Sequence, residues 1–175
     1  MKVITISGYA KAGKDLSATI LKEKLEFAGK KVLIVHYADY LKFIAQQYFG
    51  WDGKKDEKGR SLLQWLGTDK VRKTMPDFWV DIVVQLIRVF SNDFDYFIVP
   101  DTRFDNEVTS MKENFDTLSV HVTRLNFDNG LTQVQKNHPS EIALDGWKFD
   151  WYITSETGKD NLSYEIKKLI EWYEL

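Results

Sequence analysis

The sequence predicts an α/β fold of three layers, α/β/α, in which helices cover both faces of a parallel sheet of about five strands. A short apolar run at 3–6 is followed by a glycine-bearing loop, a segment with helical spacing and a second apolar run at 32–35. Such a strand–helix–strand unit favours parallel strands, because the crossover brings the chain back in the same direction. The same alternation continues along the chain. With 175 residues, we expect a single domain over 1–175 with a substantial core.

The other elements follow from the spacing of apolar residues. Helical spacing begins with Leu16 and ends near Gly29, where a glycine followed by two lysines is a stop signal. Similar patterns predict helices over 41–48, 61–66, 78–90 and 161–172, and strands over 94–99, 118–125 and 151–153. We expect the polar segment 52–60 to be a surface loop. The aperiodic segment 126–137 fits either an exposed loop or a flap over a site.

Charge and composition argue against several classes of function. The 24 basic and 26 acidic residues give a net charge of −2, which offers no general attraction to nucleic acid or to an anionic membrane. Without cysteine, neither a disulfide framework nor a thiolate metal site can form. The first apolar run is too short for a signal-peptide core, and no run reaches membrane-spanning length. We therefore expect a cytoplasmic protein whose anion sites are local.

The segment Gly8–Asp15 has the Gly-x4-Gly-Lys spacing of a phosphate-binding P-loop. Its two glycines let backbone N–H groups turn inward and approach a polyphosphate, and the helix that starts there adds its positive end. Lys14 would reach the outer phosphates. Asp15 stands where the usual motif has a Ser or Thr that coordinates magnesium, with hydroxyls nearby on Ser17 and Thr19. The alternative is a strand-to-helix turn without a ligand.

A second charged cluster follows the strand predicted over 94–99. Asp101 comes at the end of this strand, where open α/β sheets place their ligands and where P-loop proteins usually hold magnesium. Arg103 follows closely and is suited to clamp a phosphate with two hydrogen bonds. In the alternative, Asp105 or Asn106 caps a helix and Arg103 pairs with an acid.

Several motifs occur together in a fixed order: GYAKAGKD, HYADYLK, LLQWLGTDKVRK followed by DFWV, PDTRFDNE and NHPSE. Over nearly the full chain this set resembles the deoxynucleoside monophosphate kinases of bacteriophages and bacteria, a branch of the P-loop nucleotide kinases. The resemblance implies a P-loop NTPase fold and magnesium-dependent transfer of the ATP γ-phosphoryl group to a deoxynucleoside monophosphate, for DNA precursor synthesis in the host cytoplasm. Two alternatives stay open. One is a P-loop kinase for a ribonucleotide or a coenzyme precursor, and the other is a non-catalytic ATP-binding adaptor, for which the Asp15 departure is the only support.

The resemblance also implies roles for individual residues, with Lys14, Arg103 and Arg72 as the catalytic ones. The ATP contacts would be Gly8, Ala10, Lys11, Ala12, Gly13, Lys14, Asp15 and Leu16, and the metal-binding residues Asp101 and, through water, Asp15. A helical acceptor-binding region, at about 37–90, together with the segment after Asp101, would supply Asp39, Lys42, Trp65, Arg72, Trp79, Arg103 and Glu107.

Some acceptor residues have structural alternatives. Asp39 is suited to cap the helix that contains Leu41. Arg72 is suited to be a solvated helix cation, and Trp65 and Trp79 fit core positions.

By analogy with other nucleotide kinases, we expect a mobile lid at about 124–141. Its candidate residues are Arg124, Lys136, His138, Ser140 and Glu141. The first two would close over the transferring phosphoryl group, and the last three would dock the lid or start a helix capped by Ser140. His36 and His121 are expected to be structural. The implied partners are ATP and a deoxynucleoside monophosphate, without nucleic acid or membrane, and a homodimer is one alternative for the oligomeric state.

Overall fold

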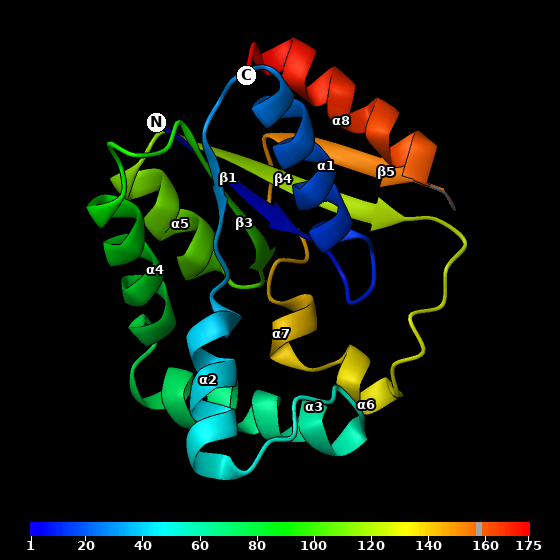
Figure 1. Ribbon diagram of the computed structural model, residues 1–175. Helices are drawn as coiled ribbons and strands as arrows, with labels where there is room; N and C mark the ends of the chain where they lie inside the picture. The colour runs from blue at the N-terminus through cyan, green and yellow to red at the C-terminus, as the bar shows by residue number, and fades with distance from the viewer. Residues whose placement is uncertain (157–158) are drawn as a thin grey trace.

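The computed structural model describes residues 1–156 and 159–175, and its strands form one parallel sheet. The strand order is β2-β3-β1-β4-β5 (Figure 1). The strands are β1 Lys2–Ser7, β2 Val32–Ile34, β3 Tyr96–Thr102, β4 Thr117–Arg124 and β5 Trp151–Ser155. The predicted parallel sheet is confirmed, and every expected strand is present in it.

Helices cover both faces of the sheet. They are α1 Lys14–Phe27, α2 Ala38–Phe49, α3 Glu57–Gln64, the π-helix η1 Trp65–Arg72, α4 Phe78–Val89, α5 Asp105–Asn114, α6 Gln133–Lys136, α7 Pro139–Ile142 and α8 Lys159–Tyr173. In Figure 1, α1 and α8 lie on one face, and α4 and α5 on the other. Neighbouring side chains of β1 point to opposite faces of the sheet. Ile4 packs with Leu21 of α1 and Ile166 of α8 on one face, and Val3 packs with Val83 of α4 on the other. The predicted three layers are confirmed.

A second group of helices lies beyond one end of the sheet. The α2–α3–η1 region has a small core of its own around Ala45, Trp51 and Leu66, and Figure 1 shows α2 and α3 together with α6 and α7, away from α1 and α8. Among the described residues, no helix is both long and apolar enough to cross a membrane. This second group supplies one wall of the candidate site.

The segment 52–60 is not entirely a loop, so this expectation was wrong. The Asp56 carboxylate accepts a hydrogen bond from the backbone N–H of Gly59 (2.8 Å), and α3 begins at the next residue after Asp56. The first turn of α3 is polar, so the spacing of apolar residues did not predict a helix there. The helix expected over 61–66 also continues to Arg72 as a π-helix, where the indole of Trp79 donates to the carbonyl of Gly67 (3.0 Å).

The carboxyl end of β3 contains a bulge. Thr5 of β1 pairs with Val99 of β3, but Ser7 pairs with Thr102, so two steps along β1 match three along β3. Pro100 lies in this stretch, and a proline is tolerated at a bulge because it has no N–H to give to the ladder. The bulge re-aims the end of β3, which borders the candidate site.

Replacing Trp79 with Phe should lower the free energy of unfolding by about 1–3 kcal/mol, because the carbonyl of the buried Gly67 would lose its indole donor. Urea denaturation measures this change. The matched control is Trp172→Phe, at a side chain that is 73% exposed, for which we expect a change within about 0.5 kcal/mol. Equal shifts in the two variants would contradict the prediction.

Candidate active site

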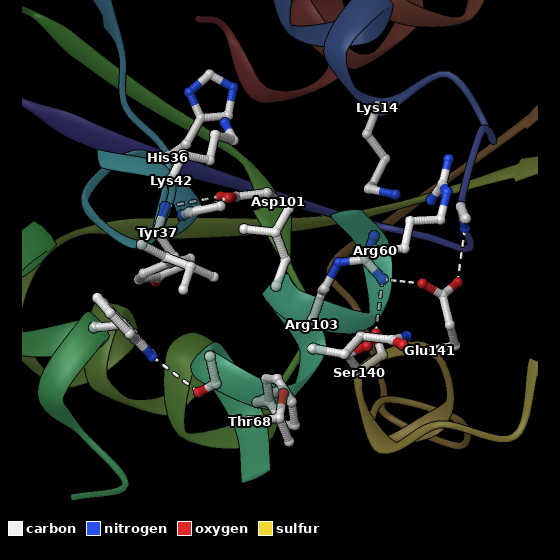
Figure 2. Close-up of a pocket in the computed structure, with 18 of the residues that line it drawn as sticks. Lys14, His36, Tyr37, Lys42, Arg60, Thr68, Asp101, Arg103, Ser140 and Glu141 are labelled. Carbon is white, nitrogen blue, oxygen red and sulfur yellow. Dashed lines mark hydrogen bonds and ion pairs between the residues drawn. The ribbon is translucent and has the colours of Figure 1, made fainter. Parts of the chain in front are cut away.

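A cavity of about 500 Å³ lies among the P-loop, the carboxyl end of β3, the α2–α3–η1 region and α7 (Figure 2). Seven Lys and Arg side chains and four carboxylates line it, so it favours anions. Its polar lining residues are Lys11, Lys14, Asp15, His36, Tyr37, Lys42, Lys55, Arg60, Gln64, Thr68, Arg72, Asp101, Arg103, Glu107, Gln135, Ser140 and Glu141.

The P-loop requires glycine at both of its fixed positions, but for different reasons. Gly8 has a φ of 144°, and a Cβ there would lie 2.3 Å from the carbonyl oxygen of Val122 in β4. Gly13 has a φ of 103° and forms the N-cap of α1, a left-handed conformation that favours glycine. From the sequence, both glycines were expected to leave room for a polyphosphate. At Gly8 the neighbouring strand already forbids a side chain.

Lys14 lines the cavity but rests on the loop from which it projects. Its ammonium donates to the carbonyls of Gly8 (2.7 Å) and Tyr9 (2.9 Å), and the residue is only 8% exposed. Burial, followed by repulsion from the Arg103 guanidinium, lowers the pKa of Lys14 to about 8. An anion in the cavity would stabilise the charged form of Lys14 and attract the ammonium away from the loop carbonyls.

Asp15 pairs with His36, for which the sequence had suggested no partner. The Nε2 atom of His36 lies 3.7 Å from the Asp15 carboxylate, and Nδ1 lies 3.3 Å from the Asp39 carboxylate. The interaction with Asp15 raises the pKa of His36 and lowers that of Asp15. His36 also lines the cavity.

Asp101 anchors the start of α2. Its two carboxylate oxygens accept hydrogen bonds from the backbone N–H groups of Tyr37 (3.0 Å) and Ala38 (2.9 Å). Asp39 was an alternative candidate for this cap, which is wrong because α2 begins one residue before it. Asp39 accepts instead from the ammonium of Lys42 (3.0 Å), and Lys42 lines the cavity.

Arg72 is held by the buried carboxylate of Glu107. Its Nη2 atom donates to Oε1 of Glu107 (2.6 Å), Nη1 donates to Asn106 (3.0 Å), and the guanidinium lies 4.0 Å from the centre of the Phe104 ring. The Arg72 side chain is 12% exposed, so the alternative of a solvated cation is wrong. Burial raises the pKa of Glu107 to about 7, although Arg72 acts in the opposite direction.

Glu107 also caps α5, a role that was expected of Asp105 or Asn106. It accepts from the backbone N–H groups of Arg103 (2.6 Å) and Phe104 (3.1 Å). In the part of the chain that the structure describes, the Asp105 carboxylate accepts a hydrogen bond only from the N–H of Asn106 (2.9 Å). The Asn106 amide reaches the backbone of Pro76 (3.2 Å) near the start of α4, because its helical position points it away from the free N–H groups of α5. The Asn106 cap is therefore wrong.

Arg103 contacts the segment expected to form the lid. Its Nη1 atom donates to the carbonyl of Ser140 (2.7 Å) and to one oxygen of the Glu141 carboxylate. The other carboxylate oxygen of Glu141 accepts from the backbone N–H of Ala10 in the P-loop (2.9 Å). Figure 2 shows Glu141 beside Arg103, with a dashed line between their side chains.

The His-Pro-Ser-Glu segment combines the two roles considered for it. It begins α7, and its glutamate docks on the P-loop. The cap is the ring of His138, whose Nδ1 accepts from the N–H of Ser140 (3.2 Å). Ser140 was wrong as the cap, because it lies inside the helix after Pro139 at its first position. A second contact joins the same regions, from the hydroxyl of Tyr9 to Asp145 (2.7 Å).

Several expected site residues do not line the cavity. Trp65 is 43% exposed and packs edge-on against Phe49 at 5.8 Å. Arg124 lies over the ring of Phe127 (3.9 Å). Lys136 pairs with Asp128 (3.4 Å), so the structure does not bring Arg124 and Lys136 to the cavity. Trp79 does line it, although it is buried as a core residue would be.

Two of the expected ATP-binding residues also lie outside the cavity lining. Leu16 is 39% exposed and does not line the cavity, nor does the buried Ala12. The hydroxyls of Ser17 and Thr19 donate to backbone carbonyls four residues earlier in the chain, both at 3.0 Å. Neither Ser17 nor Thr19 lines the cavity. On β4, His121 lies against Phe149, with ring centres 4.9 Å apart, and does not line the cavity.

Sequence reasoning missed most of the wall formed by α3 and η1. Arg60, Gln64, Thr68 and Arg72 recur every four residues and all line the cavity. This spacing places side chains along one helical face, and it was the available signal. Lys55 lines the cavity from the segment that had been assigned to a loop.

Comparisons with known proteins place this chain in a family. The family model "Deoxynucleotide monophosphate kinase" matches residues 30–166. The chain is 30% identical over 114 residues to the deoxynucleotide monophosphate kinase of Enterobacteria phage T4, covering 64% of this chain and 45% of that protein. It is 29% identical over 113 residues to that of Escherichia phage RB69, covering 63% and 44%. The matches thus span less than half the length of these curated relatives.

A solved structure supports the fold independently. Dephospho-CoA kinase from Campylobacter jejuni has a TM-score of 0.56 at 13% identity, over 99% of this chain and 98% of that chain. At this identity the likeness concerns the fold alone, and it agrees with the expected three-layer α/β/α architecture. Because the family match covers most of the sequence, the chain belongs to the deoxynucleotide monophosphate kinase family.

Proposed function

We propose that this chain transfers the γ-phosphoryl group of ATP to a deoxynucleoside 5′-monophosphate, which gives ADP and the deoxynucleoside diphosphate. The observation that carries the proposal is one continuous cavity lined by Lys14 of the P-loop and by Arg72 and Arg103 on other elements. Two phosphorylated ligands need such an arrangement, because phosphoryl transfer depends on placing them in line. Family membership supports the same reaction.

The P-loop side of the cavity is the proposed donor site. Gly13 and the start of α1 present backbone N–H groups and the positive end of the helix to the ATP phosphates. Lys14 moves from the loop carbonyls to the outer phosphates. Its charge then stabilises the negative charge that spreads over the transferring group.

The opposite side is the proposed acceptor site. Arg72 and Arg103 hold the 5′-phosphate, and Lys42 and Arg60 add positive charge to the same walls. The buried indole of Trp79 gives the cavity an apolar boundary against which a sugar or base can rest. The region at about 37–90 would thus bind the acceptor and the segment at about 124–141 would form the lid.

Magnesium belongs to the proposal because the available donors suit it. Asp15 and Asp101 both contribute carboxylates to the cavity. Within residues 1–156 and 159–175, no group of three or more acidic or histidine side chains could enclose a metal ion. This donor set fits magnesium, which keeps several waters and takes its remaining ligands from substrate phosphates. When bound, the ion would neutralise charge on the phosphates. We place the reaction in DNA precursor synthesis in the cytoplasm of a bacterial host.

A substrate panel tests the proposed reaction. Deoxynucleoside monophosphates, ribonucleoside monophosphates and dephospho-coenzyme A are each offered with ATP and magnesium, and ADP release is measured. We expect ADP release that depends on at least one deoxynucleoside monophosphate. Preference for one of the other acceptors would indicate a different small-molecule kinase, and ATP binding without any acceptor phosphorylation would indicate an adaptor.

Replacing Lys14 with Ala should lower kcat by about 10²–10³-fold, because the transition state would lose a buried positive charge. Thermal unfolding monitors the fold of the variant. Lys30→Ala, at an exposed position after α1, is the control and should keep normal turnover. Near-normal activity of the Lys14 variant would remove this residue from the mechanism.

Replacing Arg72 with Lys should raise KM for the acceptor by about 10-fold or more, because lysine cannot keep the two-sided contact with Glu107 and Asn106 while facing a phosphate. KM for ATP should change by less than about 3-fold. Steady-state kinetics with each substrate varied in turn separates the two constants. Arg88→Lys on the exposed face of α4 is the control, and an equal effect on both KM values would contradict the assignment.

A further inference from the structure

Glu141 bridges two parts of the site that lie far apart in the sequence. One carboxylate oxygen accepts the N–H of Ala10, a partner 131 residues away. The other binds Nη1 of Arg103, a partner 38 residues away. The Glu141 side chain is only 7% exposed, so the carboxylate is enclosed between the P-loop and the end of β3. No element of the proposed mechanism uses it.

The bonds on Arg103 are unevenly distributed. Both hydrogens of Nη1 are used, one by the Ser140 carbonyl (2.7 Å) and one by Glu141. The Nε and Nη2 groups donate to no residue within 1–156 or 159–175, and Arg103 lines the cavity. These two groups form an edge that can bind two oxygens of one phosphate. Fixing Nη1 on α7 therefore orients the edge that remains available to a ligand.

Glu141 orients Arg103 toward a ligand, but its negative charge opposes the binding of that ligand. A carboxylate beside an anion site repels phosphate, and its hold on Ala10 engages one P-loop N–H. These effects act on affinity. The orientation of the Arg103 guanidinium acts on the alignment of the acceptor phosphate with the transferring group, where small displacements have large effects on rate. The two contributions can be separated by measuring kcat and KM independently.

We propose that Glu141 is a positioning residue that fixes Arg103 relative to the P-loop, so that the Nε and Nη2 edge of Arg103 holds the acceptor phosphate in line with the group being transferred. This inference rests on the proposed function, because it assigns Arg103 to that phosphate. Its structural part, the restraint on Arg103, is independent of which acceptor is used.

The restraint can be measured without activity. Nitrogen-15 NMR of the arginine side chains should show separate Nη1 and Nη2 signals for Arg103 in the unmodified protein, because the bonds to α7 slow rotation about its Nε–Cζ bond. Loss of these signals in Arg103→Lys assigns them. In Glu141→Ala the two signals should merge, whereas Glu113→Ala on the exposed face of α5 should leave them separate. Merged signals in the unmodified protein, or separate signals in Glu141→Ala, would overturn the proposal.

Kinetics tests the consequence for transfer. Glu141→Ala should lower kcat by about 10–100-fold while KM for ATP changes by less than about 3-fold or decreases. In Arg103→Lys, adding Glu141→Ala should change kcat by less than about 2-fold, because the two residues act as one unit. Glu141→Gln, which keeps the side-chain volume, should show a smaller loss than Glu141→Ala.

The outcomes are distinguishable from failure of the proposed function. Unchanged or higher kcat in Glu141→Ala, or losses that simply multiply with those of Arg103→Lys, would overturn the positioning role. If no deoxynucleoside monophosphate supports ADP release by the unmodified protein, the proposed function fails. The NMR measurement still decides whether Glu141 fixes Arg103, and circular dichroism confirms that each variant is folded.

Discussion

The parallel pairing of β1 with β3 is the constraint on which the candidate site depends. In their register Ser7 lies opposite Thr102, so Gly8, which opens the P-loop, and Arg103 both leave the sheet at neighbouring points. Hydrogen bonds of the strand ladder and the buried side chains of β1 and β3 hold this alignment. The P-loop and a guanidinium separated by about half of the chain are thereby brought to the edge of one cavity.

Three consecutive residues at the end of β3 connect the parts around this edge. Asp101 binds the first N–H groups of α2, Thr102 pairs with β1, and Arg103 binds α7. Glu107, a few residues later, also joins separate parts of the chain. Its carboxylate accepts hydrogen bonds from the Arg72 side chain and from the backbone N–H of Arg103. Because a buried carboxylate is stabilised only when it is paired or hydrogen-bonded, these contacts favour a single arrangement. Both arginines therefore contact buried acids, Arg72 through Glu107 and Arg103 through Glu141.

The sheet was predictable because each buried strand is a short apolar run and the helices between them carry helical spacing. The α3–η1 segment was predicted poorly, since its first turn is polar and its π-helix receives a hydrogen bond from Trp79, which comes later in the chain. Lys14, Arg72 and Arg103 could be placed from motifs, whereas Glu141 could not be assigned its partners, because its contact with Ala10 spans 131 residues. Arg124 and Lys136 were chosen by analogy with other lids. Their side chains are engaged by nearby Phe127 and Asp128 instead.

The central claim is that one cavity holds both a donor and an acceptor phosphate. The most direct measurement is a crystal structure with a non-hydrolysable ATP analogue and a deoxynucleoside monophosphate bound together. The account predicts the triphosphate on the P-loop with Lys14 turned toward it, the acceptor phosphate on Arg72 and Arg103, and an acceptor oxygen within about 3.5 Å of the terminal phosphorus. A structure in which the acceptor binds outside this cavity, or in which Lys14 stays on the carbonyls of Gly8 and Tyr9 beside bound nucleotide, would contradict it.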